Sequence, residues 1–167
     1  GQRYATIFND LSDPEGARVI EVVPERTQEA ATGLLQSLSP EQREKLLPPL
    51  AAGDLRFALS LTEPGGGTDV LGALRTHAER RNGEWVINGS KAFITNAGTD
   101  LTQLVTVTAV TGTRPDGGKE ISAIIVPSGT PGFVVGQRYS KVGWNASDTR
   151  ELSFTDVRVP EENLVGE

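Results

Sequence analysis

After residue 53 the sequence is dominated by β-branched runs separated by turn signals, and this alternation limits the possible folds more than any other feature of the chain. "RFALSLTEP" is a short apolar run, and the β-branched runs read "LTQLVTVTAV", "ISAIIVPS" and "ELSFTDVRVP", of which the last is expected to alternate strictly. β-branched residues favour strands, while "RPDGG", "GTPG" and "NASD" favour turns. Five or more strands with no helix between them predict an antiparallel barrel or sandwich.

One hairpin is expected within "EWVINGSKAFIT", because Asn88-Gly89 is a pair typical of a two-residue type I′ turn. Apolar residues on both sides of the pair support strands that flank this turn. His77, in "RTHAERRN", is expected on an exposed strand.

The first fifty residues carry helical patterns instead. Residues 23–38 place Ala, Leu and Gln at helical spacing. The stretch "SPEQREKLLPPL" is clearer, because Ser39 is suited to the N-cap, Pro40 fits the first helical position and Gln42 completes a capping box.

Pro48 and Pro49 are expected to end this second helix, since proline removes a backbone donor and crowds the preceding turn. The sequence therefore predicts a mainly β protein in which a short α-helical segment, residues 1–52, precedes a β domain, residues 53–167.

Composition excludes several kinds of function. The chain has no cysteine and a single histidine, which argues against disulfides, thiolate chemistry and a metal centre. Its net charge of −6, with acids and bases interspersed, disfavours nucleic-acid binding. No apolar run is long enough to span a membrane, and the first residues do not resemble a signal peptide. The lack of methionine and the connector-like ending "VPEENLVGE" suggest a piece of a larger protein.

Three consecutive glycines in "TEPGGGTD", residues 62–69, raise the question of a ligand site. The stretch is not a Walker loop, because the lysine and the spacing are missing, and it is not the G-x-G-x-x-G of dinucleotide-binding proteins. Glycine permits tight turns and a close approach of the backbone to a ligand. The residues alone leave both a plain turn and a ligand cradle open.

Three motifs that occur in the same order as in one protein family favour a ligand site at the glycine stretch. "TEPGGGTD" (62–69), "NGSKAFITN" (88–96) and "GWNASDTRELSFTDVRVPEEN" (143–163) together resemble the middle domain of acyl-CoA dehydrogenases. The resemblance implies an antiparallel β-barrel middle domain preceded by the end of the N-terminal helical domain. The C-terminal helical bundle of that family is absent from this chain.

The resemblance also implies a function. Family members use FAD to oxidise an acyl-CoA thioester to the 2,3-enoyl-CoA, with hydride transfer to the flavin. They pass electrons to electron-transfer flavoprotein or a similar acceptor. They form homotetramers or homodimers, in the cytoplasm or, in eukaryotes, in the mitochondrial matrix. The catalytic base of the family usually lies in the missing bundle, so it is expected outside this chain, which is expected to be inactive alone.

Four residues are implied to contact the flavin. By resemblance, Leu61 and Thr62 meet the polar edge of the isoalloxazine at the end of a strand, through backbone groups and a hydroxyl. Phe93 matches an aromatic position that packs against the flavin, and Thr95 matches a hydroxyl near N5. Read without the motifs, Phe93 could equally be a core residue and the two threonines ordinary strand residues.

Gly67 and Thr68 match family positions near the FAD pyrophosphate, and Thr68 is also implied to contact the acyl-CoA. Among the other polar residues, Glu63 is expected to fix the geometry of the turn rather than to act as a base. Asp148 and Arg150 are expected to order a turn as an ion pair. Trp144 is left open between packing against another domain and lining the cofactor site.

Three other functions remain compatible with the sequence. The first is a sister flavoenzyme on the same fold, such as an acyl-CoA oxidase or a nitroalkane oxidase. The second is a non-enzymatic relative that serves as a scaffold or binding module. The third, an all-β interaction module without flavin, is weakened by the few aromatic residues, several of which stand at motif positions.

Overall fold

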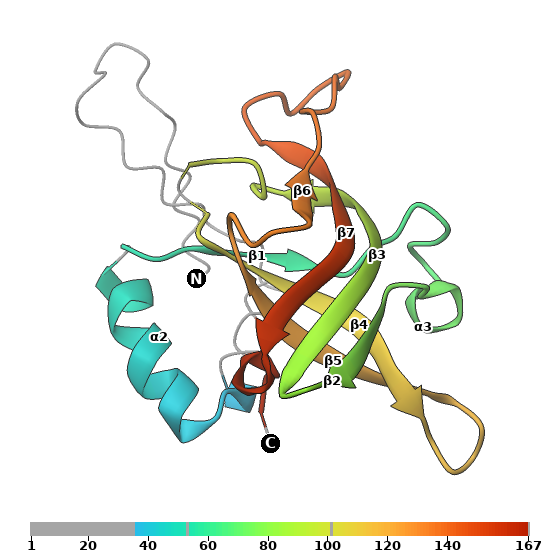
Figure 1. Cartoon of the computed structure of the whole chain (residues 1–167). Coiled ribbons are helices and arrows are strands. Elements are labelled where there is room, and N and C mark those ends of the chain that lie inside the picture. The colour runs from blue at the N-terminus through green and yellow to red at the C-terminus, as the bar shows by residue number, and fades with distance from the viewer. Residues whose placement is uncertain (1–35, 53, 101, 167) are drawn as a thin grey trace, which may run out of the picture. The chain divides into compact units, whose positions relative to one another are not determined.

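The computed structural model describes residues 36–52, 54–100 and 102–166 (Figure 1). The elements described below belong to the unit Ser37–Glu167. Residues 23–35 of the helix expected over residues 23–38 lie outside the described residues. The proposed domain boundary between residues 52 and 53 stays a prediction.

Helix α2, Pro40–Ala52, begins as the sequence predicts. The Ser39 hydroxyl accepts from the Gln42 amide at 3.2 Å, and Gln42 Oε1 accepts from the Ser39 amide at 3.1 Å. This reciprocal pair confirms the capping box. Gln42 Nε2 also donates to the carbonyls of Glu162 and Leu164, which ties the start of α2 to the segment after the last strand.

The two prolines do not end α2, so that prediction was wrong. Pro48 and Pro49 both lie inside the helix. A proline ring holds φ near −65°, which is a helical value, so the backbone can continue although a donor is lost. The Pro49 carbonyl accepts from the amides of Asp54, at 2.9 Å, and Leu55, at 3.0 Å, which closes the end of the helix.

A single curled sheet makes up most of the remaining structure. Its strands are β1 (Phe57–Ser60), β2 (His77–Arg81), β3 (Glu84–Thr95), β4 (Leu104–Thr113), β5 (Lys119–Pro127), β6 (Phe133–Val135) and β7 (Thr149–Pro160), followed by the 3-10 turn η1 (Glu161–Asn163). The strand order is β1-β4-β2-β3-β7-β6, and β5 pairs with β4. The long strands β3 and β7 bend together across the sheet (Figure 1). The predicted mainly β, barrel-type fold is confirmed as a half-barrel.

Two details differ from the expectation of antiparallel strands without helices. β1 pairs with β4 in parallel, and the connection between these two strands contains β2 and β3. β2 also meets β4 in parallel at one position. The short helix α3, Val70–Ala73, lies between β1 and β2, with the Asp69 side chain accepting from the Gly72 amide at its start.

The core consists of apolar side chains from one face of the sheet. The buried cluster contains Ala58, Ala78, Ile87, Ile94, Ala97, Val105, Val107, Ala109, Ile124, Val126, Leu152, Phe154, Val157 and Val159. In β7 the buried positions change from even to odd numbers after Phe154, so the expected alternation is interrupted. Asp156 has φ +49° at this point, and the pairing with β3 shifts register between Ile87 and Gly89. A β-bulge therefore reverses the faces.

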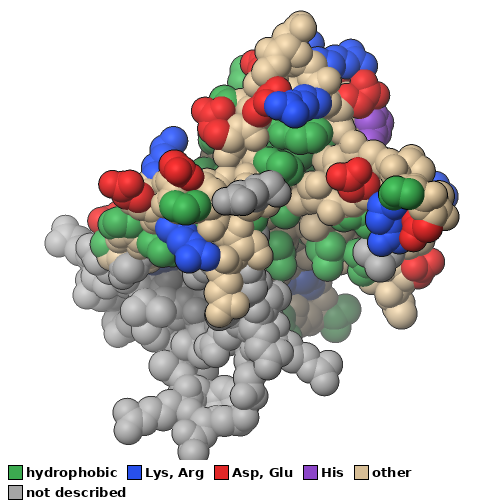
Figure 2. Space-filling model, turned by 90° about the horizontal axis from the view of Figure 1, so that it is seen from below, with side chains coloured by type: hydrophobic (Ala, Val, Ile, Leu, Met, Phe, Trp, Pro, Cys, Tyr) green, Lys and Arg blue, Asp and Glu red, His purple; other side chains and the backbone are tan. Residues whose placement is uncertain are grey.

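The surface seen in Figure 2 carries acidic and basic side chains interspersed with apolar ones, rather than gathered by sign. His77 lies exposed at the start of β2, as predicted. Within the described ranges, no helix has the length and apolar character needed to cross a membrane.

The predicted hairpin turn at Asn88-Gly89 was wrong, and a different Asn-Gly pair makes the turn. Asn82 and Gly83, with φ of +53° and +83°, connect β2 to β3. Asn88-Gly89 lies within β3, where the Asn88 side chain exchanges two hydrogen bonds with Asp156. Gly89 has φ +150°, and a Cβ there would come within 2.6 Å of Thr76 Cα.

Substitution by alanine should therefore destabilise the protein less at Gly83 than at Gly89. Gly83→Ala places a methyl group in open space and should cost only the strain of its positive φ, about 1–2 kcal/mol. Gly89→Ala also presses on the Thr76 backbone, which should add about 1–3 kcal/mol. Urea unfolding of both variants measures the difference. Equal losses in the two variants would contradict the proposed close packing of Gly89.

Candidate functional site

The glycine-rich stretch begins with a tight turn after β1. The Glu63 amide donates to the Gly66 carbonyl at 3.3 Å, and the Gly66 amide returns a bond to Glu63 at 3.1 Å. A Cβ on Gly66 would clash with the Ala73 side chain in α3, so glycine is needed there for packing. A Cβ on Gly65 would meet nothing, and one on Gly67 would make ordinary contact with Thr62 Cγ2 at 3.6 Å. The run is therefore a packed turn at Gly66 and an open surface at Gly65 and Gly67.

Unpaired polar groups lie on the glycine turn and at the end of β3. Within the described part of the chain, the hydroxyls of Thr62, Thr68 and Thr95 make no hydrogen bond, and neither do the amides of Gly67 and Thr68. Thr68 and Thr95 are exposed and Thr62 is half-buried. Two consecutive amides beside a hydroxyl are suited to binding an anion.

Phe93 is the most unusual residue of the site. It has φ +61°, in the left-handed region, and its side chain is 65% exposed. It is therefore not a core residue, whereas its neighbour Ile94 is buried. A register shift between Lys91 and Ile94 in the pairing with β7 creates this arrangement. The ring of Tyr139 meets Phe93 edge to face, with 5.4 Å between centroids.

The structure brings the predicted residues of both motifs together. The Ala92 amide donates to the Thr62 carbonyl at 2.9 Å, so Thr62 lies against β3 immediately before Phe93. Gly67 lies against Thr62, and Thr68 follows it. Thr95 is the last residue of β3, two positions after Phe93.

The predicted flavin contact of Leu61 stays a prediction. Its side chain is 36% exposed at the same surface, but its carbonyl accepts a hydrogen bond from Lys91 Nζ at 3.1 Å. The Thr62 carbonyl is likewise occupied by Ala92. The Thr62 hydroxyl and the backbone amides of Leu61 and Thr62, which make no hydrogen bond among the described residues, are therefore the polar groups that this segment can offer to a ligand.

A buried ion pair lies directly behind this surface. Lys91 Nζ lies 3.0 Å from Glu63 Oε1, and the two side chains are 0% and 5% exposed. Glu63 also accepts from the amides of Arg75, at 2.7 Å, and Thr76, at 2.9 Å. The predicted structural role of Glu63 is confirmed. Lys91 was not predicted as a buried residue, because a lysine in "NGSKAF" is typical of a surface charge.

Burial and hydrogen bonding act against each other on both charges. Burial alone would raise the pKa of Glu63, but the hydrogen bonds from Thr76, Lys91 and Arg75 outweigh it and the pKa lies below its ordinary value. Burial lowers the pKa of Lys91, and the bond to Glu63 opposes this change. Because Glu63 is held by three donors, it is poorly placed to act as a base.

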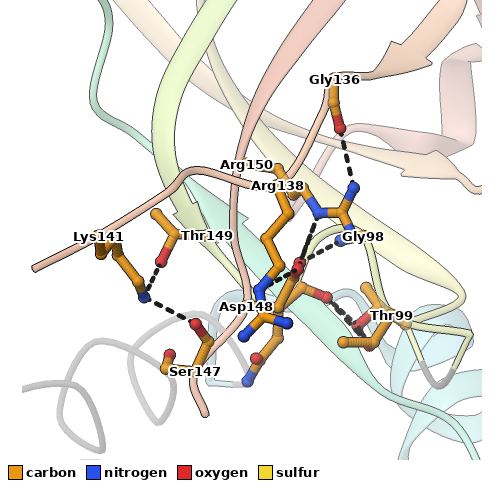
Figure 3. A network of polar contacts seen from close by, with 11 residues as sticks. Gly98, Thr99, Gly136, Arg138, Lys141, Ser147, Asp148, Thr149 and Arg150 are labelled. Carbon is orange, nitrogen blue, oxygen red and sulfur yellow. Dashed lines mark hydrogen bonds and ion pairs between the residues drawn. The ribbon is translucent and has the colours of Figure 1, made fainter. Parts of the chain in front are cut away.

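A second polar network fixes the end of β3 (Figure 3). The buried Asp148 accepts from Arg150 Nε at 2.8 Å and from the Gly98 amide at 3.1 Å, which confirms the predicted ion pair. Arg150 also donates to the Gly136 carbonyl at 3.1 Å. The network joins the turn after β3 to the segment that carries Tyr139, so it supports the contact between Tyr139 and Phe93.

For Trp144, packing against another domain and lining the cofactor site both remain predictions. Its side chain is 88% exposed and its φ is +56°, on a loop whose Lys141 donates to Ser147 and Thr149. The loop therefore presents the indole to solvent in an ordered conformation.

Comparison with known proteins identifies the domain. A family model described as acyl-CoA dehydrogenase, middle domain, matches residues 58–157, which include both the glycine-rich turn and the bulge of β3. The chain belongs to the acyl-CoA dehydrogenase family. The predicted resemblance is confirmed.

Individual members of the acyl-CoA dehydrogenase family agree with this match. An acyl-CoA dehydrogenase of Bacillus subtilis is 48% identical over 128 residues, which cover 75% of this chain and 32% of the relative. The structure of butyryl-CoA dehydrogenase from Megasphaera elsdenii superposes with a TM-score of 0.73 at 40% identity, covering 82% of this chain and 35% of that one.

A third relative carries the cofactor. Glutaryl-CoA dehydrogenase from Mycobacterium smegmatis, in complex with FADH2, superposes with a TM-score of 0.72 at 35% identity, covering 82% of this chain and 33% of that chain. The chain thus spans about a third of the length of each of these three relatives.

Glu63 should make the stability of the protein depend on pH. Because its pKa is lowered by folding, its ionised form stabilises the fold above its ordinary pKa of about 4.5, and this contribution is lost as the pH falls through the folded value. Glu63→Gln should cost about 3–5 kcal/mol at pH 7, because Lys91 is left buried without a counter-charge. The difference in unfolding free energy between Glu63→Gln and the unaltered protein should become smaller below about pH 4.5.

Urea unfolding at a series of pH values measures this prediction. The matched control is Glu79→Gln, which removes an exposed ion pair with Arg81 and should cost less than about 1 kcal/mol. A Glu63→Gln deficit that stays constant down to pH 3 would show that ionisation of Glu63 does not stabilise the fold.

Proposed function

We propose that this chain is the flavin-contacting part of an FAD-dependent acyl-CoA dehydrogenase, which oxidises an acyl-CoA thioester to the 2,3-enoyl-CoA. The observation that carries the proposal is the exposed, left-handed Phe93 lying beside Thr62 and Gly67. An aromatic side chain held outward at a cost of about 1–2 kcal/mol needs a partner that recovers this free energy. The planar isoalloxazine ring is such a partner.

The polar groups of the surface fit the rest of the cofactor. The Thr62 and Thr95 hydroxyls have no other partner among the described residues and can donate to or accept from the uncharged edge of the ring. The amides of Gly67 and Thr68 can bind a pyrophosphate or the phosphate-bearing part of the substrate, because the surface at Gly67 is open. Leu61 adds an exposed apolar contact.

FAD bound at this surface would supply the hydride acceptor that the oxidation of the acyl chain requires. Phe93 would cover part of the ring and exclude water from it. The threonines would hold the orientation of the ring relative to the thioester. The base that removes the α-proton is proposed to lie outside this chain, since the carboxylates beside the turn are engaged by backbone amides or an arginine.

Two properties of the complete protein follow from this proposal. Its electron acceptor is proposed to be electron-transfer flavoprotein or a similar protein, and it is proposed to act as a homotetramer or homodimer. The alternatives are an acyl-CoA oxidase or nitroalkane-oxidase-like flavoenzyme, in which reduced flavin reacts with oxygen, and a scaffold that has lost the reaction.

Three measurements on the complete protein separate these functions. We expect a flavin absorbance spectrum, bleaching of this spectrum by an acyl-CoA without oxygen, and turnover with an artificial electron acceptor. Reoxidation by air as fast as by the artificial acceptor would favour the oxidase. Absence of flavin would favour the scaffold and overturn the proposed dehydrogenase.

The glycines of the turn give a sharper test of FAD binding. Gly67→Val should leave the fold intact but weaken FAD binding severely, because the new side chain covers the open amides beside Thr62. Thr68→Ala should be milder, losing one hydrogen bond to a charged group, about 1.5–3 kcal/mol of binding free energy.

Gly65→Val is the matched control, since it adds the same side chain to the same turn where nothing lies within 4 Å of its Cβ. Flavin content and thermal unfolding are measured for all three variants. If folded Gly67→Val retained FAD as well as Gly65→Val does, the glycine run would be only a turn.

A further inference from the structure

Lys91 is a fully buried lysine that is not among the groups proposed to touch FAD or the substrate. Its ammonium donates to the Leu61 carbonyl at 3.1 Å, to Glu63 Oε1 at 3.0 Å and to Thr108 Oγ1 at 3.3 Å. An ammonium has three donors, so each finds an acceptor. The side chain therefore has one defined position inside the protein.

The acceptors come from different parts of the sheet. Thr108, on β4, donates its own hydroxyl to the Ser60 carbonyl at the end of β1, at 3.2 Å. Glu63 binds the amides of Arg75 and Thr76, just before β2. Through these bonds Lys91 connects the segment after β1 to three neighbouring strands.

Lys91 and Ala92 together set the position of the segment that carries Thr62. The side chain of Lys91 holds the Leu61 carbonyl, and the amide of Ala92 holds the Thr62 carbonyl. Two consecutive residues of β3 thus bind two consecutive carbonyls, immediately before the bulge at Phe93. The spacing between the Thr62 hydroxyl and the Phe93 ring depends on this double attachment.

Filling the same volume does not require a charge. A buried ion pair must be desolvated, and apolar residues of similar size often stabilise a fold as well or better. An apolar side chain at position 91 would leave the Leu61 carbonyl without this donor. The feature that the charge adds is therefore the fixed position of residues 61–63.

We propose that Lys91, together with Glu63, is a positioning residue for the cofactor, because it fixes the Leu61 carbonyl and thereby the position of Thr62 beside the part of β3 that carries Phe93. The inference rests on the function proposed above and extends it to residues that do not contact the ligand. Loss of Lys91 releases the Leu61 carbonyl and lets Thr62 move away from β3. FAD would then contact Phe93 but lose its contact with Thr62.

The test compares FAD affinity with fold stability in the complete protein. Lys91→Met removes the charge and keeps most of the volume, and it should lower the melting temperature and raise the FAD dissociation constant at least tenfold. Lys91→Met/Glu63→Gln removes both charges, so it should recover part of the melting temperature while the dissociation constant stays at least tenfold raised.

Val126→Ala is the matched control, since it removes methyl groups from a fully buried side chain of β5, whose partner in the sheet is Val105 of β4 and not residues 61–63. Its FAD dissociation constant should stay within about twofold of the original, as core cavities act mainly on stability. Titration of the apoproteins with FAD, followed by flavin fluorescence, gives the dissociation constants, and thermal unfolding gives the stabilities. If Lys91→Met does not fold, the FAD dissociation constants and melting temperatures of the double variant and of Val126→Ala are compared instead.

Two results would overturn the positioning role. The first is an FAD dissociation constant that returns to its original value in the double variant as stability recovers. The second is a Val126→Ala protein whose FAD affinity falls as far as that of the Lys91 variants. A complete, unaltered protein that binds no FAD would instead overturn the proposed function, and the positioning role with it.

Discussion

The ladder between β3 and β7, with its two register shifts, decides which side chains the core receives and which the surface receives. Side chains alternate along a strand, so one inserted residue sends every following side chain to the opposite face. The shift at Gly89 moves the buried set of β7 from Leu152 and Phe154 to Val157 and Val159. The shift before Ile94 leaves Phe93 outside the core. Without this second shift the proposed flavin surface would lack its aromatic ring.

The stability of the sheet supports the unfavourable features of the site. Phe93 is left-handed and exposed, several hydroxyls and amides have no partner among the described residues, and Lys91 and Glu63 are buried charges. The left-handed backbone of Phe93 and the two buried charges cost free energy in the protein without a ligand, whereas the exposed hydroxyls and amides can bind water. These features lie close together along residues 61–68 and 91–95, whereas the apolar core cluster is regular. Local violations that gather in one place are typical of a binding site.

Sequence patterns predicted those parts of the fold that short-range chemistry determines. The capping box of α2 and the β-branched strands follow from neighbouring residues. The choice between the Asn-Gly pairs at 82–83 and 88–89 does not, because both have the same turn chemistry and only strand pairing distinguishes them. The parallel pairing of β1 with β4 also depends on distant residues.

The same limit applied to the site itself. The motifs located Thr62, Gly67 and Phe93, and the structure brings these three residues together. No local signal could show that Lys91 is buried, since its partners lie 17 to 30 residues away in the sequence. The interruption in β7 did leave a trace, because Thr155 and Asp156 are two consecutive polar residues between apolar ones. A search for paired polar residues within alternating strands would have found it.

The distribution of charge around the site indicates what this chain contributes to the reaction. Glu63 is paired with Lys91 and Asp148 with Arg150, while the exposed Asp69 carboxylate accepts a hydrogen bond from the Gly72 amide at the start of α3. The exposed surface between them therefore offers neutral hydroxyls, amides and an aromatic ring. Such groups suit an uncharged flavin ring, whose orientation they can fix without altering its charge. A base at this surface would need a carboxylate free of these partners, so the proposed division of labour leaves binding and orientation to this domain and proton abstraction to another part of the enzyme.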